Sequence, residues 1–474
     1  MLSGSHLFIR VSPKLVRLTQ LPIIDLTEGS ILHRLTKLAL PIIGTSFVQM
    51  AYSLIDMIWV GRLSSDAVAA VGTASFFTWL ASAVILVARV GAEVGVAQSI
   101  GKKDEQEAKR YVGHSLQLIL VLSVIYGALL IAFRQPLIGF YRLGPSVEEQ
   151  ARIYLVIVAL GMPFFTVNPV FTAIFNGAGD SRTPFKINVV GLAANIILDP
   201  VLIFGLGPFP RLETAGAALA SIIAQFIASA VFFLQTKKRP ELFSGLRLLE
   251  KPDWNYLKRI VMLGLPMAVQ SAFFTTIAMV IARIIAQWGP LPIAVQKVGS
   301  QIESISWLTA GGFQTAMSAF IGQNYGAEKW DRVYKGYFVG IGIVSVLGVF
   351  ATLLLIFGAG PIFAIFIPEP EAISQGVVYL KILGLSQLWM CIEIVTAGAF
   401  IGHGKSFPPS IVSIVFNLLR IPGALLLSST ALGLEGIWWA ISISSIFKGL
   451  VLSLWHLRYL KTHPEISCLR LAGK

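Results

Sequence analysis

The sequence has little charge for its length. Of its 474 residues, 13% are charged and 55% are hydrophobic, whereas soluble globular domains carry about a quarter charged residues. The mean hydropathy of +0.76 agrees with this composition. A soluble enzyme is excluded on these grounds, and we predict an integral membrane protein.

Cysteine and catalytic motifs are also scarce. The two cysteines, Cys391 in an apolar run and Cys468 near the C-terminus, cannot build a disulfide framework. There is no phosphate-binding loop, no dinucleotide fingerprint and no histidine or cysteine spacing typical of a metal site. We therefore expect neither an enzyme nor an ATP-driven pump, and no cofactor. The first 30 residues lack the apolar core of a signal peptide, so the first spanning segment should direct insertion.

Long apolar runs dominate what is present. Twelve of them are long enough to span a bilayer as helices, at about 36–60, 67–99, 111–133, 151–175, 184–206, 214–235, 256–286, 293–321, 333–358, 373–401, 408–430 and 434–457. Turn signals rich in glycine or proline separate them. The sequence thus predicts an all-α integral membrane protein with twelve transmembrane helices.

The basic residues, which give a net charge of +13, lie mostly in the termini and in the loops that follow even-numbered helices. By the positive-inside rule, both termini are expected in the cytoplasm. Topology explains the charge, so a nucleic-acid partner is not expected. We divide the chain into a cytoplasmic N-terminal segment (1–35), a first lobe (36–235), a cytoplasmic linker (236–255), a second lobe (256–457) and a cytoplasmic tail (458–474).

The two halves repeat. Leu38-Ala-Leu-Pro41 recurs as Leu263-Gly-Leu-Pro266, and Gly177-Ala-Gly-Asp-Ser181 as Gly402-His-Gly-Lys-Ser406. A third motif, Gln98-Ser-Ile-Gly101, is matched to Ala319-Phe-Ile-Gly322. Because each half has an even number of helices, both enter the membrane from the same side and their pseudo-symmetry axis follows the membrane normal. We expect a cavity between the lobes and alternating access by rocking.

An acid and an amide share one face of the fifth apolar run. Asn195 and Asp199 are one helical turn apart, and Pro200 should free the backbone carbonyl of Ile196. Acids at membrane depth usually mark an ion or substrate route, although Asp199 held only for packing is the alternative. Asp56 in the first run has no basic neighbour in sequence. If Asp56 meets Asp199, the pair should hold a proton or a metal cation.

Other charges at membrane depth have open roles. Arg89 and Glu93 have the spacing of an intrahelical ion pair, so a structural role is at least as well supported as a functional one. In the second half the candidates form either a satisfied network or a second proton or substrate route: Lys297, Glu303, Glu393 and Arg420. Isoleucines occupy the positions that correspond to Asp56 and Asp199, which confines the predicted cation site to the first lobe.

These motifs together resemble the multidrug and toxic compound extrusion (MATE) family, prokaryotic type, over about residues 30 to 460. They are Leu40-Pro41, Leu54-Ile-Asp56-Met-Ile-Trp-Val-Gly61, Gly177-Ala-Gly-Asp180-Ser and Asn195-Ile-Ile-Leu-Asp199-Pro200. The resemblance implies two six-helix lobes and export of bulky, often cationic and aromatic compounds in exchange for Na⁺ or H⁺.

The resemblance also assigns residues. It implies a cation or proton site of Asp56, Asn195, Asp199 and Ser221, where Ser221 replaces the threonine of many relatives; Asp56 and Asp199 would be metal ligands if Na⁺ is the coupling ion. Pro41 would permit bending of the first helix, with Pro200 as a second helix-bending proline. Relatives with a second-lobe site carry an acid in helix seven, where this chain has Thr275 and Thr276. This departure argues against coupling through the second lobe, with substitution by Glu303 of the eighth run as the alternative.

The expected function is secondary-active multidrug efflux by a monomer in the cell membrane of a bacterium or archaeon, with small organic molecules and the lipid bilayer as its partners. Aromatic residues are candidates for the cavity wall: Phe76, Phe77, Trp79, Phe164, Phe165, Trp307 and Trp389. The alternative is a flippase for lipid-linked saccharides, which would need a strongly cationic cavity. A channel or membrane scaffold is the third class.

Overall fold

The computed structural model describes residues 25–246, 248 and 251–462, and over these ranges the chain is helical with no strand. The all-α prediction is confirmed. Most of the predicted N-terminal segment, most of the C-terminal tail and Arg247 of the linker lie outside the described residues.

The helices of the first half follow the predicted runs closely. They are α2 (Ile31–Gly61), α3 (Ser65–Gly101), α4 (Glu105–Ala132), the short α5 (Arg134–Gly139), α6 (Pro145–Leu160), α7 (Met162–Gly177), α8 (Arg182–Phe204) and α9 (Glu213–Thr236). A short α10 (Pro240–Phe243) lies in the linker.

The second half repeats this order. It comprises α11 (Trp254–Ile285), the 3-10 turn η1 (Ala286–Trp288), α12 (Pro290–Gly326), α13 (Trp330–Phe357), the short α14 (Ala359–Ala364), α15 (Pro370–Gly384), α16 (Gln387–Gly402), α17 (Phe407–Leu418), α18 (Arg420–Ser428) and α19 (Leu434–Thr462).

Eleven of the twelve predicted spans are apolar enough to cross a membrane. Among the described residues, nine such segments are continuous, α17 with α18 counting as one, and the bent pairs α6–α7 and α15–α16 add two more. The twelfth, α12, is 37 residues long but is more polar. It nevertheless packs along α16, α2 and α3 as part of the bundle, and the twelve-helix, two-lobe architecture is confirmed.

Two spans are bent where the sequence predicts unbroken runs. The axes of α6 and α7 differ by 51°, and those of α15 and α16 by 47°. Gly161 separates the first pair, and Pro163 in the first turn of α7 has no N–H with which to continue the hydrogen bonding of α6. Apolar composition is unchanged across both breaks, which is why the runs do not reveal them.

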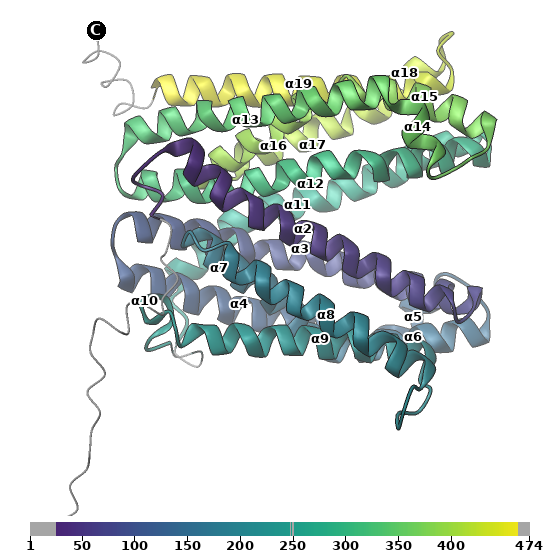
Figure 1. Cartoon of the computed structure of the whole chain (residues 1–474), viewed down its shortest axis with the longest axis horizontal. Helices are drawn as coiled ribbons and strands as arrows, with labels where there is room; N and C mark the ends of the chain where they lie inside the picture. Colours follow the sequence, from purple (N-terminus) through teal and green to yellow (C-terminus); the bar gives the residue numbers. More distant parts are fainter. Residues whose placement is uncertain (1–24, 247, 249–250, 463–474) are drawn as a thin grey trace, which may run out of the picture.

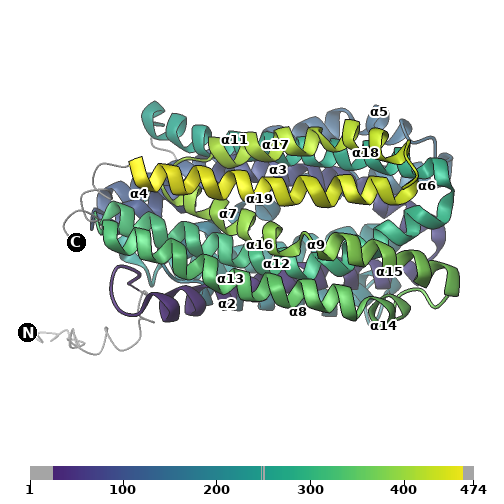
Figure 2. The same ribbon diagram turned by 90° about the horizontal axis from the view of Figure 1, so that it is seen from above.

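The helices form two lobes that lie side by side along their length (Figure 1). The first helix of each half crosses from the opposite lobe to its own. Leu38 near the start of α2 packs with Phe320 of the second half, whereas Val60 at its end belongs to a first-half core. Likewise, Ile260 near the start of α11 lies in a first-half core and Ile284 near its end in a second-half core. In Figure 2, turned by 90°, the helices remain nearly parallel to the long axis.

The lobes are fastened together at the end of the bundle where α2 begins. Gln98 of α3 donates a hydrogen bond through Nε2 to the carbonyl of Gly402 (3.0 Å), and Gln323 of α12 donates through Nε2 to the carbonyl of Gly177 (2.9 Å). The two bonds are related by the repeat. We call this pair of hydrogen bonds the glutamine latch.

Glycine is required beside the latch. A Cβ on Gly101 would meet the backbone oxygen of Gln323, and a Cβ on Gly326 would meet that of Gln98. These reciprocal contacts align Gln98–Gly101 with Gln323–Gly326. The match to Ala319–Gly322 drawn from the sequence is therefore wrong by one helical turn, because a shared Ile-Gly pair outweighed the glutamine that makes the equivalent bond.

Candidate functional site

The structure brings together the four residues predicted to form a cation site. α8 lies between α2 and α9 and places Asn195 and Asp199 against their neighbours. Ser221 Oγ of α9 donates to Asp56 Oδ2 of α2 (3.2 Å), and Asn195 Nδ2 donates to Asp199 Oδ1 (3.0 Å). The carboxyl groups of Asp56 and Asp199 contact each other directly.

Three oxygens of this cluster accept no hydrogen bond from any residue that the structure describes. They are Asp56 Oδ1, Asn195 Oδ1 and Asp199 Oδ2. The side chains of Asn195 and Asp199 are 0% exposed, so these oxygens are removed from water at a considerable free-energy cost. A cation or a shared proton would satisfy them, since carboxylate and amide oxygens suit hard cations.

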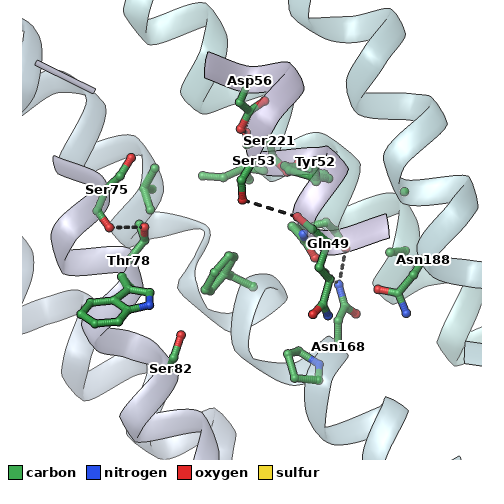
Figure 3. A pocket seen from close by; sticks show the side chains of 18 of the residues that line it. Gln49, Tyr52, Ser53, Asp56, Ser75, Thr78, Ser82, Asn168, Asn188 and Ser221 are labelled. Carbon is green, nitrogen blue, oxygen red and sulfur yellow. Dashed lines mark hydrogen bonds between the residues drawn. The ribbon is translucent and has the colours of Figure 1, made fainter. Parts of the chain in front are cut away.

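A cavity of about 730 Å³ adjoins the cluster (Figure 3). Asp56 and Ser221 lie on its wall with Tyr52, while the buried Asp199 lies behind them. All of its lining residues fall between Val48 and Ala228. The cavity is thus formed within the first lobe, whereas the sequence predicts a cavity between the lobes.

The lining combines aromatic and uncharged polar side chains. Trp79 and Phe165, two of the predicted aromatic residues, contribute to the wall. Polar groups also line it: Gln49, Ser53, Ser75, Thr78, Ser82, Asn168, Asn188 and Gln225. Asn168 is held by Ser229 Oγ (2.8 Å) and by the side chain of Gln225 (2.8 Å). The polar wall is partly pre-organised.

Arg89 and Glu93 do not form the predicted ion pair. Arg89 lines the cavity, while Glu93 is buried near the lobe boundary, where its backbone oxygen abuts Gly177. The two described side chains have no ion-pair contact, although the charge of Arg89 acts on Glu93 across the intervening space. Their separation leaves Arg89 as the one basic residue that the described part of the chain contributes to the cavity wall.

Charges in the second lobe are only partly satisfied. Glu393 pairs with Lys448 Nζ at 3.1 Å, both side chains being nearly buried. Arg420 donates to Ser444 Oγ (2.7 Å) and Ser445 Oγ (2.9 Å). Lys448 was missed by the sequence analysis, although a single lysine in the middle of the last apolar run is the signal that points to such a partner.

Glu303 is less completely paired. It accepts a hydrogen bond from Gln387 Nε2 (3.2 Å), and Ser306 Oγ donates to Gln387 Oε1 (2.7 Å). Glu303 Oε1 has no donor among the described residues. Lys297 is exposed and lies outside this cluster, which corrects its inclusion in a second-lobe network.

Comparison with known proteins follows the internal repeat. The MatE family model matches the chain twice, over residues 41–201 and 266–426. The two matches begin at Pro41 and Pro266, the prolines of the repeated Leu-Pro motif.

Similar sequences span nearly the whole chain. A probable multidrug resistance protein NorM from Thermotoga maritima is 29% identical over 416 residues, which cover 87% of this chain and 89% of the relative. An FAD transporter from Shewanella oneidensis is 25% identical over 425 residues, covering 88% and 92%.

Solved structures share the fold. A MATE family transporter of the MOP superfamily in an outward-facing conformation has a TM-score of 0.85 at 23% identity, covering 95% of this chain and 99% of that one. A MOP superfamily transporter from Pyrococcus furiosus, described as having a binding pocket of reverse polarity, has a TM-score of 0.84 at 22% identity over 95% and 99%.

Proposed function

The chain belongs to the MatE family, and on that premise we propose that it exports organic compounds in exchange for Na⁺ or H⁺ bound between Asp56 and Asp199. One observation carries this proposal. Two contacting carboxyl groups, one of them on the wall of a drug-sized cavity and the other buried behind it, leave oxygens without donors among the described residues. A cation at that place changes the net charge of a site to which three helices contribute.

The site is placed to couple ion binding to movement. Asp56 is on α2, which packs on the second lobe at its start and on the first lobe at its end. Ion binding changes the contacts of α2 with α8 and α9, so it biases how α2 is held between the lobes. A ligand shifts a conformational equilibrium only through such differential contacts. Pro41 and Pro200 lie inside α2 and α8 and reduce the hydrogen bonding that would resist bending.

The cavity favours aromatic organic cations. Asp56 is the one acidic residue in its described lining, and Trp79, Phe165 and Tyr52 offer ring faces suited to cation–π contacts. The name of a relative, the probable multidrug resistance protein NorM, supports export of drugs in general. A lipid-linked pyrophosphate would need several basic residues, and among the described residues Arg89 alone supplies one to this wall.

We place both termini in the cytoplasm and the protein in the cell (inner) membrane as a monomer. With this orientation, the glutamine latch closes the cytoplasmic end. Alternating access requires the latch to open so that substrate can enter from the cytoplasm or the inner leaflet.

The test is ethidium accumulation in inside-out vesicles, with a Na⁺ gradient and a pH gradient imposed separately. We expect accumulation under one gradient and its loss in Asp199→Asn at equal expression. Asp66→Asn is the matched control, because Asp66 is exposed at the start of α3, and it should transport normally. Undiminished transport by Asp199→Asn would overturn the coupling site, and failure of a whole panel of cationic dyes would favour the flippase.

A further inference from the structure

A second pocket, of about 570 Å³, lies at the latch end of the bundle. It is formed by the start of α11, the turn between α16 and α17, and the ends of α3 and α12. Lys258, Arg259 and Lys405 are basic residues on its wall, and Asp and Glu are absent from its described lining. Gln98 of the glutamine latch forms part of the same wall.

These three basic side chains are not neutralised by the protein. None of them makes an ion pair with a carboxylate among the described residues. Lys405 Nζ lies 4.2 Å from the centre of the Tyr459 ring, and the Arg259 guanidinium lies 5.9 Å from that of Tyr111. Ring contacts of this kind orient a cation without cancelling its charge. The pocket therefore presents a concentrated positive charge.

The equivalent place in the first half carries its own anion. The repeat aligns Lys405 with Asp180. Asp180 accepts hydrogen bonds from the backbone N–H and the hydroxyl of Thr183 (3.1 and 2.7 Å) and pairs with Arg239 at 2.6 Å. The second half replaces this carboxylate with a lysine and places two more basic residues beside it, and no carboxylate among the described residues complements them.

Side chains have to provide the recognition. Pro408 and Pro409 occupy the start of α17 and have no N–H to offer an anion. Lysine ammonium groups bind phosphate as point charges. Met262 and Phe407, which also line the pocket, are each 64% exposed. The pocket thus combines basic groups with exposed apolar side chains, the two features that an anionic lipid would need.

We propose that this pocket binds the phosphate of an anionic phospholipid from the leaflet on the latch side. The phosphate contacts Lys258, Arg259 and Lys405, and an acyl chain follows Met262 and Phe407. The lipid also abuts Gln98, which donates to the Gly402 carbonyl across the lobe boundary. Its binding thus stabilises the state in which this end is closed. The proposal is independent of the coupling ion and of the exported compound.

The test compares retention of phosphatidylglycerol and phosphatidylcholine on the purified full-length protein by native mass spectrometry. We expect selective retention of phosphatidylglycerol. Each basic residue near an anionic lipid surface contributes about fivefold to affinity, so Lys258→Gln with Lys405→Gln should weaken binding about 25-fold. Both side chains are exposed, and these substitutions should leave folding intact, as judged by the thermal unfolding midpoint.

Lys237→Gln with Lys238→Gln is the matched control, since both lysines are exposed in the linker on the same side. It should change phosphatidylglycerol retention less than twofold. Equal losses of phosphatidylglycerol retention in the two double variants would show that retention depends on general surface charge, and would overturn the proposal. Displacement of the lipid by millimolar glycerol 3-phosphate would also overturn it, in favour of a soluble phosphate ligand.

A Lys405→Asp variant places at this position the acid that the first half has at Asp180. It should lose phosphatidylglycerol retention while keeping the fold.

Discussion

At the scale of single residues, Ser221 is the member of the cation site that is hardest to predict from the sequence, because a serine in an apolar helix does not by itself indicate a functional role. Its hydroxyl donates to Asp56 Oδ2 at 3.2 Å. A hydrogen bond to a charged group is worth about 1.5 to 3 kcal/mol. For Na⁺ coupling, Ser221→Ala should therefore raise the Na⁺ concentration for half-maximal transport about tenfold, and Ser221→Thr should leave it nearly unchanged.

Vesicle transport at graded Na⁺ concentrations measures this effect. Ser53→Ala is the control, because Ser53 lines the same cavity but bonds only to the Gln49 carbonyl of its own helix. An unchanged Na⁺ requirement in Ser221→Ala would remove the serine from the ion site.

Arg239 and Asp180 form a buried ion pair outside the spans, with side chains 9% and 7% exposed. Removing one partner of such a pair leaves an uncompensated buried charge and costs about 3 to 5 kcal/mol. Arg239→Ala should accordingly lower the thermal unfolding midpoint in detergent by several degrees. Lys335→Ala, which breaks the exposed pair with Asp331, should change stability by less than about 1 kcal/mol.

Sequence reasoning located part of the site because polar residues in apolar runs are conspicuous. Asp56, Asn195 and Asp199 were found in this way, and the structure brings them into contact. Ser221 required a family resemblance. Gln387 and Lys448 were missed because their partners, Glu303 and Glu393, lie on other helices, and pairing across helices leaves no mark in local spacing.

At the scale of elements, the crossing of α3 and α12 depends on having no side chain at Gly101. Overpacking of this kind typically costs 1 to 3 kcal/mol, and the backbone oxygen of Gln323 cannot rotate away from a new Cβ. Gly101→Ala should destabilise the closed latch, lower the thermal midpoint and reduce transport. Gly326→Ala should reproduce the effect by symmetry.

Gly72→Ala in the same helix provides the matched control. Gly72 has no atom within 4 Å of an added Cβ, and alanine is the better helix former by about 1 kcal/mol. Its midpoint should therefore stay equal or rise. A similar fall in both variants would refute the close-approach argument.

Element positions follow from apolar length, and all twelve runs were predicted. Their bends were not. The breaks near Gly161 and between α15 and α16 arise from packing between helices and from a lost backbone donor, whereas hydropathy reports only how well a segment tolerates lipid. The alignment of Gln98 with Ala319 was wrong for a related reason. Gln98 and Gln323 are equivalent because they make the same hydrogen bond, and the residues next to them in sequence do not reveal this.

At the scale of the molecule, the lobes must separate at the latch end if transport uses alternating access. An added Cβ on Gly322 would lie 2.8 Å from the Cβ of Ala97 in the opposite lobe. A disulfide prefers about 3.8 Å between Cβ atoms, so a small separation of α3 and α12 would admit one. Ala97→Cys with Gly322→Cys, in a background lacking Cys391 and Cys468, should form a disulfide and lose at least nine-tenths of its transport, roughly a tenfold effect.

Reduction by dithiothreitol should restore transport, which makes the reduced protein its own control for the strain of the substitutions. Full transport by the cross-linked form, verified by gel shift, would show that this end need not open.

The polarity of α12 has a consequence for how the protein is made. Lys297 and Glu303 lie within a helix that falls short of the hydropathy of a span, and charged residues inside a spanning segment are costly unless they are paired or face the protein interior. As the nascent chain emerges, α12 is therefore a poor substrate for insertion by itself. Its place in the bilayer is secured by α16, α2 and α3. Since α16 is synthesised later than α2 and α3, the full set of helices that holds α12 in the bilayer is complete only after the ribosome has passed most of the second half.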